Sequence, residues 1–229
     1  MAQAWSVTGS SRGLGHAIVE AGLAAGNKVL ATARDIKSLA DLSERYGDQV
    51  KLFAMDVTDE AAAANAVMAA VDVFGSLDVV INNAEYGNLS SVEDTPLSEF
   101  RAQIETNLFG TIIVTKAALR YFREQKAGQF IQFSSVGGRI GPPGRGPYSA
   151  AKWGVEGFWC FRAKWHRSAS RSPSLNPVAF AQTSRAVPPN LAKVILNTIR
   201  RLELPQDFSG TTTASSLVTP KRQLRRSSS

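Results

Sequence analysis

The pair of residues best suited to proton transfer in this sequence is Tyr148 and Lys152, which lie four positions apart. On a helix, residues at this spacing share one face, one turn from each other. A tyrosine hydroxyl has an ordinary pKa near ~10, and a neighbouring ammonium lowers that pKa because it favours the phenolate. Tyr148 could then give a proton to the oxygen of a carbonyl that accepts a hydride, or take it back in the reverse reaction. Taken alone, the spacing fits better a lysine that lies along a packed tyrosine.

Two further polar residues could assist such a reaction. Ser135 lies thirteen residues before Tyr148, at the end of a predicted strand, and its hydroxyl could hydrogen-bond the same substrate oxygen. Asn107 lies in the middle of a predicted helix, where asparagine is disfavoured. Its position alone favours a side chain that faces water, and the alternative is a task such as holding a water molecule.

A glycine-rich segment near the amino terminus could bind a phosphate. Residues 7–15 read VTGSSRGLG and lie between a short apolar run and an alanine-rich stretch, which predicts a strand, a tight turn and a helix. Glycine permits positive φ and lets a ligand approach the backbone closely. The helix after the turn presents N–H groups and a partial positive charge to an anion. The three glycines alone would equally fit an ordinary turn.

The elements that must position these residues alternate along the chain. Strands are predicted at Ala4–Thr8, Lys28–Ala33, Val50–Met55, Leu77–Asn82 and Gln129–Ser134, and helices at Leu14–Gly26, Ile36–Tyr46, Glu60–Phe74 and Leu97–Gln125. This alternation predicts right-handed βαβ crossovers and a parallel sheet that helices cover on both faces. Such sheets bind ligands beyond the carboxyl ends of their strands, so the polar residues just after each strand are candidates for a site.

The residues after the second strand bear on the choice of cofactor. Ala33 stands where an NAD-binding domain often carries an acidic residue for the ribose 2′-hydroxyl, and Arg34 follows it. Together with Arg12 in the glycine turn, Arg34 suits a 2′-phosphate and therefore NADP. The alternative is that both arginines are solvated surface charges.

Polar residues also follow the third and fourth strands. Asp56 could accept a hydrogen bond from an adenine amino group, or it could cap the helix that begins near Asp59. Asn82 and Asn83 could join neighbouring strand ends to a nucleotide ribose, or they could simply form a turn.

Length and composition fit one globular domain. The chain has 229 residues, of which 44% are hydrophobic and 20% charged. No stretch has the apolar length of a membrane span, and a strand begins within about five residues of the start, which leaves no room for a signal peptide. Cys160 is the single cysteine, which excludes an intramolecular disulfide and argues against a zinc cluster. We therefore expect a cytoplasmic protein with no metal site and no membrane partner.

Taken together and in order, the glycine turn, Asp56, the asparagine pair, Asn107, Ser135, Tyr148 and Lys152 resemble the short-chain dehydrogenase/reductase family, over about residues 4–158. The resemblance implies an α/β fold, a Rossmann-type doubly wound parallel sheet with helices on both faces. It implies an oxidoreductase that transfers a hydride between NADP, rather than NAD, and a carbonyl or secondary alcohol. It also implies a homodimer or homotetramer, often formed through the helices at residues 97–125 and 148–158.

By the same resemblance, each motif residue would have a role. The catalytic residues would be Asn107, which holds a proton-relay water, Ser135, which orients the substrate oxygen, Tyr148, the acid/base, and Lys152, which binds the nicotinamide ribose and lowers the pKa of the tyrosine. The cofactor-binding residues would be Gly9, Ser11, Arg12, Gly13, Leu14, Gly15, Arg34, Asp56, Val57, Asn83, Ala84, Tyr148 and Lys152. Among these, the glycines would form the pyrophosphate turn, Arg12 and Arg34 would select NADP, Asp56 and Val57 would contact the adenine, and Asn83 and Ala84 the adenosine side.

The chain departs from the family pattern at Glu85, where the family's Asn-Asn-Ala-Gly reads Asn-Asn-Ala-Glu. If the family glycine uses positive φ, a glutamate there carries a backbone penalty. Its charge could weaken NADP binding near the phosphates, or the side chain could turn outward without effect. An alternative function is therefore a non-catalytic nucleotide-binding or protein-interaction module that derives from such an enzyme.

The second departure begins after Phe158. Residues 1–158 hold 14 Lys/Arg against 17 Asp/Glu, whereas residues 159–229 hold 12 against 2. No Pro-Gly and no convincing sixth strand follow, so we expect the sixth and seventh strands to be missing or altered. One hypothesis is translation out of the ancestral reading frame over about residues 159–187, and the other is a divergent substrate lid with a basic tail. A basic tail can contact nucleic acid, but no motif accompanies it, so nucleic acid is not an expected partner.

The sequence thus predicts three parts. Residues 1–158 form the Rossmann-type NAD(P)-binding and catalytic domain, residues 159–208 are a divergent remnant of the substrate-binding region, and residues 209–229 are a basic tail. Disorder is expected over residues 168–187 and 209–229.

Overall fold

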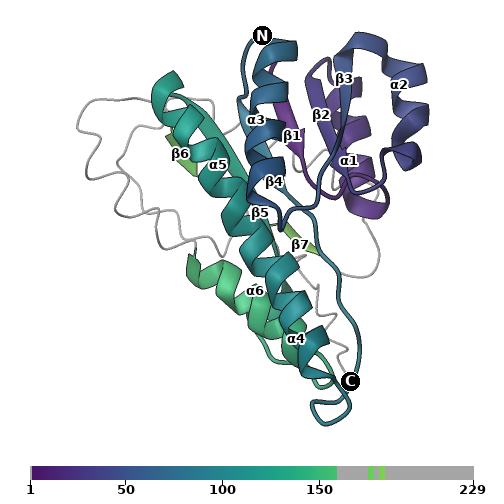
Figure 1. Ribbon diagram of the computed structural model, residues 1–229, viewed down its shortest axis with the longest axis vertical. Coiled ribbons are helices and arrows are strands. Elements are labelled where there is room, and N and C mark those ends of the chain that lie inside the picture. The colour runs from purple at the N-terminus through teal and green to yellow at the C-terminus, as the bar shows by residue number, and fades with distance from the viewer. Residues whose placement is uncertain (1, 159–174, 178–180, 184–229) are drawn as a thin grey trace, which may run out of the picture.

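The structure, a computed structural model, describes residues 2–158, 175–177 and 181–183 (Figure 1). Its centre is a sheet of the strands β1 (Ala4–Val7), β2 (Lys28–Ala33), β3 (Val50–Ala54), β4 (Val79–Asn82), β5 (Gly128–Ser135), β6 (Leu175–Pro177) and β7 (Ala181–Thr183). The strand order is β3-β2-β1-β4-β5-β6, and β7 also pairs with β5. All pairings are parallel. The chain order reverses between β1 and β4, which is where such sheets open a crevice for a ligand.

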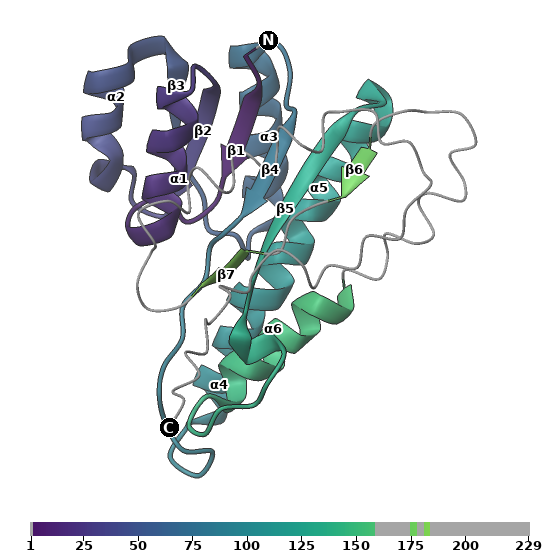
Figure 2. The ribbon, with the colours of Figure 1, turned by 180° about the vertical axis from the view of Figure 1, so that it is seen from behind.

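Helices connect the strands and cover both faces of the sheet. They are α1 (Gly13–Ala24), α2 (Ala40–Tyr46), α3 (Glu60–Phe74), α4 (Leu97–Ile104), α5 (Gly110–Gln125) and α6 (Gly146–Phe158), with short 3₁₀ turns at Ile36–Leu39, Gly47–Gln49 and Val136–Gly138. Helices α3 and α5 pack on the face seen in front in Figure 1, and α1 and α2 pack on the face seen in front in Figure 2. None of the helices in the described residues combines the length and hydropathy that crossing a bilayer requires.

Alternating side chains of the strands divide the core into two clusters. Trp5 and Val7 of β1 pack with the helices α1 and α2, whereas Ala4 packs with α3 and α5. On β4, Ile81 joins the first cluster and Val80 the second. Because both faces are buried, each strand reads as a continuous apolar run rather than as an alternating one. Burial of each large apolar side chain contributes about 1.5–3 kcal/mol to the stability of the fold. The two clusters thereby hold the strands, and the loops at their carboxyl ends, in place.

The predicted fold class, an α/β parallel sheet with helices on both faces, is confirmed. Helix α3 has the predicted bounds, and Asp59 explains its start. The Asp59 Oδ1 atom accepts hydrogen bonds from the backbone N–H groups of Ala61 (2.8 Å) and Ala62 (2.9 Å), as an N-cap residue does. Gly75 ends the helix at a φ of 83°, in the left-handed region.

The single helix predicted over Leu97–Gln125 is wrong in one respect. Helices α4 and α5 are separated by a π-helical turn, Glu105–Phe109, in which the hydrogen-bond spacing widens by one residue. Asn107 lies in this turn and is 0% exposed, so the expectation that its side chain faces water is also wrong. Single π-helical turns inside helices occur frequently at functional sites.

The edge of the sheet beyond β5 is partly covered. Strand β6 pairs with residues 128–130 and β7 with residues 133–135. Each of the two strands has three residues, in line with the expected alteration of the sixth and seventh strands. They correct the expectation of disorder at residues 175–177 and 181–183. The rest of residues 168–187, and all of residues 209–229, lie outside the described part of the chain.

Candidate active site

The glycine turn between β1 and α1 packs directly against the end of β4. Gly9 has a φ of +69°, and a Cβ atom there would lie 2.7 Å from the Cα atom of Ala84. A Cβ atom on Gly15 would overlap the carbonyl oxygen of Gly9 and lie 2.5 Å from Asn83 Nδ2. Gly13 also has positive φ, at +58°, but open space surrounds it. Gly9 and Gly15 are therefore required by close packing, and Gly13 by backbone conformation.

Asn83 and Thr8 hold the end of β4 against this turn. The Asn83 side-chain Nδ2 donates to the carbonyl oxygens of Thr8 (3.0 Å) and Gly9 (3.2 Å). The Thr8 hydroxyl in turn accepts from the backbone N–H groups of Asn83 and Ala84, both at 3.0 Å. Asn82 points elsewhere and donates to Thr115 Oγ1 and Gln132 Oε1. Of the two readings of the asparagine pair, the structure supports the one in which they join neighbouring strand ends.

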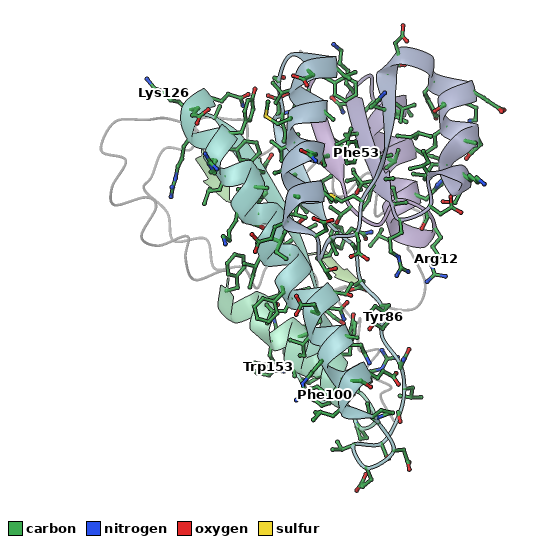
Figure 3. All side chains as sticks on the ribbon, viewed as in Figure 1. Arg12, Phe53, Tyr86, Phe100, Lys126 and Trp153 are labelled. Atoms are coloured by element: carbon green, nitrogen blue, oxygen red, sulfur yellow. The ribbon has the colours of Figure 1, made fainter. Side chains whose placement is uncertain are left out.

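A cavity of about 660 Å³ opens at these strand ends. Its wall contains all the predicted cofactor-binding residues except the two on α6: Gly9, Ser11, Arg12, Gly13, Leu14, Gly15, Arg34, Asp56, Val57, Asn83 and Ala84. The wall also includes residues outside the predicted cofactor-binding set: Ala33, Asp35, Ser38, Met55, Glu85, Tyr86 and Thr106. Figure 3 shows Arg12 and Tyr86 on the same side of the molecule. The cavity collects the carboxyl ends of β1 to β4, as the parallel sheet predicts.

One rim of the cavity carries two exposed arginines, Arg12 and Arg34. The acidic residue beside them, Asp35, is committed to the backbone, because its carboxylate accepts from the N–H of Lys37 at 2.9 Å and caps the 3₁₀ turn. The rim therefore offers two positive side chains toward an anion at the end of β2.

Asp56 lies at the end of β3 and does not cap α3, since Asp59 does so. Its Oδ1 atom accepts from the backbone N–H of Thr58 (3.0 Å) and from the Thr58 hydroxyl (2.8 Å). The pKa of the Asp56 carboxyl is lowered, chiefly because the Thr58 N–H stabilises the charged form, and the positive charge of Arg34 adds to this effect. A carboxylate with unused oxygen lone pairs thus lines the cavity.

Tyr148 and Lys152 lie one turn apart on α6, and both are buried, at 6% and 2% exposure. The Lys152 Nζ atom donates to the carbonyl oxygen of Phe133 at 2.8 Å and forms an ion pair with Glu85. The Tyr148 hydroxyl donates to the same carboxylate, at 3.2 Å from Oε2 and 3.4 Å from Oε1 of Glu85. Glu85 thus joins both side chains, and because it also lines the cavity, it connects the cavity to α6.

The expectations for Glu85 need two corrections. The side chain does not turn outward, because its carboxylate contacts Lys152 and Tyr148. The backbone penalty is absent as well, since Lys126 is the non-glycine residue with positive φ among the described residues. A buried ammonium requires a counter-charge or several hydrogen bonds, and the carboxylate supplies the counter-charge for Lys152.

Two glycines flank the Tyr148 ring. A Cβ atom on Gly87 would lie 2.7 Å from Tyr148 Cδ2, and one on Gly137 would lie 3.3 Å from Cδ1. Gly137 belongs to the 3₁₀ turn that Ser135 begins, and its N–H donates to the Ser135 hydroxyl oxygen at 3.2 Å. The backbone that carries Ser135 at the end of β5 is therefore packed against the tyrosine ring.

Asn107 acts on the loop that carries Glu85. Its Oδ1 atom accepts from the N–H of Tyr86 at 3.0 Å, and its Nδ2 atom donates to the carbonyl oxygen of Tyr86 at 2.7 Å. This pair of bonds resembles a strand ladder and fixes the backbone next to Glu85. Tyr86 itself lines the cavity, and burial raises the pKa of its hydroxyl, with a further increase from Glu99 and an opposing effect from Arg34. An asparagine inside a predicted helix, where that residue is disfavoured, was the one sequence signal for this contact.

The structure therefore places the predicted residues in two groups that Glu85 joins. Most of the predicted cofactor-binding residues line the cavity, whereas Tyr148 and Lys152 lie on α6 beyond Glu85. The turn that follows Ser135 packs against the Tyr148 ring through Gly137. Asn107 hydrogen-bonds the backbone of Tyr86, in the loop that carries Glu85.

Comparison with known proteins shows which proteins this chain is similar to. The family model described as short chain dehydrogenase matches residues 3–168. Oxidoreductase BOA17 of Botryotinia fuckeliana is 38% identical across an alignment that covers 90% of this chain and 87% of that protein. An uncharacterised oxidoreductase of Schizosaccharomyces pombe, C162.03, is 39% identical over 153 residues, which cover 66% of this chain and 51% of that protein. The chain spans about half the length of several such curated relatives.

Solved structures agree with the sequence matches. A short-chain dehydrogenase from Streptomyces avermitilis superposes with a TM-score of 0.75 and 28% identity, over 90% of this chain and 86% of that one. The family match covers more than half of the chain and includes the glycine turn, the cavity and α6. This chain belongs to the short-chain dehydrogenase family of oxidoreductases.

Proposed function

We propose that this protein is an NADP-dependent oxidoreductase that transfers a hydride between the nicotinamide and a carbonyl or secondary alcohol, with Tyr148 as the acid/base. The observation that carries the proposal is that the cavity and the pair of Tyr148 and Lys152 lie next to each other, on either side of one residue. A cavity with a glycine turn and a helix amino terminus lies on one side of Glu85, and the buried pair of Tyr148 and Lys152 lies on the other. Family membership supports the reaction class.

The cavity wall fits a dinucleotide in several ways. The turn at Gly9 and Gly13 leaves backbone N–H groups and the start of α1 open to a phosphate, since no Cβ intrudes there. Arg12 and Arg34 would hold a 2′-phosphate at the rim, and Asp56 would accept a hydrogen bond from the adenine amino group. Val57 would also contact the adenine, and Asn83 and Ala84 would contact the adenosine side.

When bound, the nicotinamide supplies or accepts the hydride, and the protein handles the proton. The Tyr148 hydroxyl would donate its proton to the substrate oxygen as that oxygen gains negative charge, and it would take the proton back in the oxidative direction. The Ser135 hydroxyl oxygen accepts from Gly137, which leaves its own proton to donate to the same substrate oxygen. The ammonium of Lys152 would stabilise negative charge on Tyr148 and hold the ribose of the cofactor.

The test is a thermal-shift titration of the whole chain with NADPH and separately with NADH. A ligand at a hundredfold excess over its dissociation constant stabilises the folded state by roughly 2.7 kcal/mol. We expect a clear shift with NADPH and a smaller one with NADH. In Arg34→Ala, the NADPH shift should fall toward the NADH shift, whereas Arg123→Ala, on an exposed part of α5, should change neither. Equal shifts for both cofactors in the unmodified chain would contradict the NADP preference.

A second function has one specific observation in its favour. The carboxylate of Glu85 contacts both groups that the reaction needs, which suits a protein that binds a nucleotide without turnover. Cofactor consumption with a panel of aldehydes, ketones and secondary alcohols distinguishes the two functions. A chain that binds NADPH and oxidises it with no member of the panel would be the non-catalytic module.

The organisation of the chain is part of the proposal. Residues 1–158 would form the cofactor-binding and catalytic unit, residues 159–208 a divergent substrate region and residues 209–229 a basic tail. The match with the Botryotinia protein covers 90% of the chain and so extends past residue 168, where the family model stops. Trp153 of α6 and Phe109 of the π-helical turn that precedes α5 are 53% and 45% exposed, which suits a homodimer or homotetramer through these two helices. Light scattering after size-exclusion chromatography gives the oligomeric mass directly.

A further inference from the structure

Glu85 combines three properties that no other acidic side chain in the described residues shares. It lines the cavity, it forms an ion pair with the buried ammonium of Lys152, and it accepts a hydrogen bond from the hydroxyl of Tyr148. Its side chain is 23% exposed, whereas that of Lys152 is 3% exposed. One partner of the pair is therefore fixed inside the protein, and the other reaches it from the cavity side.

The loop that carries Glu85 is held firmly, so the contact is a property of the fold at this position. Thr8 accepts from the N–H of Ala84 just before Glu85, and Asn107 makes two hydrogen bonds with the backbone of Tyr86 just after it. Only the side chain of Glu85 has the freedom to leave, by rotation about its own bonds. A departure toward the cavity would bring the carboxylate near water without a change in the loop.

We propose that Glu85 is an intramolecular competitor of the cofactor: its carboxylate occupies the ammonium of Lys152 and the hydroxyl of Tyr148, and it must move away before a nicotinamide ribose can bind Lys152. This inference rests on the proposed function, because it assigns a specificity role within the same site. The competition concerns the ribose next to the nicotinamide, because Glu85 contacts Lys152 and Tyr148. The adenosine half of the cavity, which is the part lined by the glycine turn, Arg12, Arg34 and Asp56, lies outside this competition.

The competition predicts how much cofactor affinity is lost and which part of the cofactor is affected. A hydrogen bond or ion pair that involves a charged group contributes roughly 1.5–3 kcal/mol, which corresponds to about a tenfold to hundredfold change in affinity. A ligand that needs Lys152 loses that factor, and a ligand that ends before Lys152 does not. Two ligands that differ only in this half of the molecule therefore separate competition from a general change in the fold.

The experiment measures the affinity of the whole chain for NADPH and for adenosine 2′,5′-bisphosphate, a fragment without the nicotinamide and its ribose. Isothermal titration is done on the unmodified chain, on Glu85→Gln, which removes the charge, and on Glu85→Gly, which removes the side chain. Glu124→Gln, an exposed glutamate on α5, is the matched control for the loss of one negative charge. We expect both Glu85 variants to bind NADPH about tenfold to a hundredfold more tightly and the fragment unchanged, and the control to match the unmodified chain.

Other outcomes overturn the proposal in distinguishable ways. Equal NADPH affinity in all four proteins would mean that Glu85 does not compete. An equal gain for NADPH and the fragment would point to a general electrostatic or structural effect on the cavity. Binding of neither ligand by any variant, in proteins that still unfold cooperatively, would overturn the proposed function itself and the competition with it.

Discussion

The adenosine half of the cavity, which is proposed to hold the adenosine of the cofactor, and the α6 half of the site are built on different principles. The first depends on backbone: the glycine turn packs against β4 so closely that Gly9 and Gly15 admit no side chain, and Thr8 and Asn83 join the two strand ends. The second depends on charged and polar side chains, Tyr148, Lys152 and Glu85, whose relations change with a single substitution. If the proposed function holds, such a site can keep its capacity to bind a nucleotide while its α6 half is altered.

The largest effect that would sharpen this contrast is expected for Tyr148→Phe. The ring would still fill its place between the flanking glycines, but the proton donor would be gone. Turnover should fall by about 10²–10⁴-fold, the usual contribution of a positioned acid/base, while NADPH still gives a thermal shift. Rates of NADPH oxidation and melting curves on one preparation measure the two quantities. Phe74→Leu, a core change far from α6, is the control for a nonspecific loss. A variant that retains full turnover would show that Tyr148 is not the acid/base.

The substitution Gly15→Ala should disrupt the glycine turn and with it the adenosine half of the cavity. The new Cβ atom would overlap the Gly9 carbonyl oxygen and lie 2.5 Å from Asn83 Nδ2, so the turn must shift. We expect a loss of stability of about 3 kcal/mol, the upper end of the usual cost of overpacking, and no measurable binding of adenosine 2′,5′-bisphosphate. Gly141→Ala, where nothing lies within 4 Å of the new atom, is the matched control. Urea unfolding and titration calorimetry report the two effects, and an unchanged affinity would contradict the packing argument.

A smaller effect is expected at the connection between the halves. Asn107→Ala would leave the N–H and the carbonyl oxygen of Tyr86 without their side-chain partner, at a cost of about 1–3 kcal/mol for the two bonds. Because Glu85 lies next to Tyr86, NADPH affinity should change as well, and fragment affinity should not. Asn88→Ala, in the exposed part of the same loop, is the control. If Asn107→Ala changed both affinities by one factor, the loop would not separate the halves.

The smallest effect concerns Asp56 and acid. The pKa of its carboxyl is lowered in the folded state, so the stabilisation that it provides is present above its ordinary pKa and is lost as the pH falls through the folded value. The unmodified chain should melt at a slightly higher temperature than Asp56→Asn at pH 7, and the two curves should converge below about pH 4. Melting scans across this pH range test the sign. A difference that grows toward acid would refute it.

Much of the adenosine half could be predicted from sequence because its signals are local. The spacing of Gly9, Gly13 and Gly15 between an apolar run and a helical stretch specifies the turn, and Asp59 specifies the start of α3. The parallel sheet followed from the alternation of strands and helices. Tyr148 and Lys152 were also predicted, since four-residue spacing places them on one face of a helix.

The features that the sequence did not reveal all depend on contacts between distant segments. The Glu85 side chain points toward α6 because the buried ammonium of Lys152, 67 positions later, needs a counter-charge. The π-helical turn at Asn107 accompanies a contact with Tyr86 that no periodicity contains. Strands β6 and β7 form against β5 although their residues, Leu175–Pro177 and Ala181–Thr183, carry no clear strand pattern.

The two glycines beside Tyr148, Gly87 and Gly137, determine when the entropic cost of ordering the tyrosine side chain is incurred. A side chain that moves among several rotamers must be ordered at each reaction, and that loss of freedom raises the barrier. Here the backbone at Gly87 and at Gly137 confines the ring from both sides. Folding therefore orders the tyrosine ring once, and in the proposed reaction no further ordering of that ring would be needed.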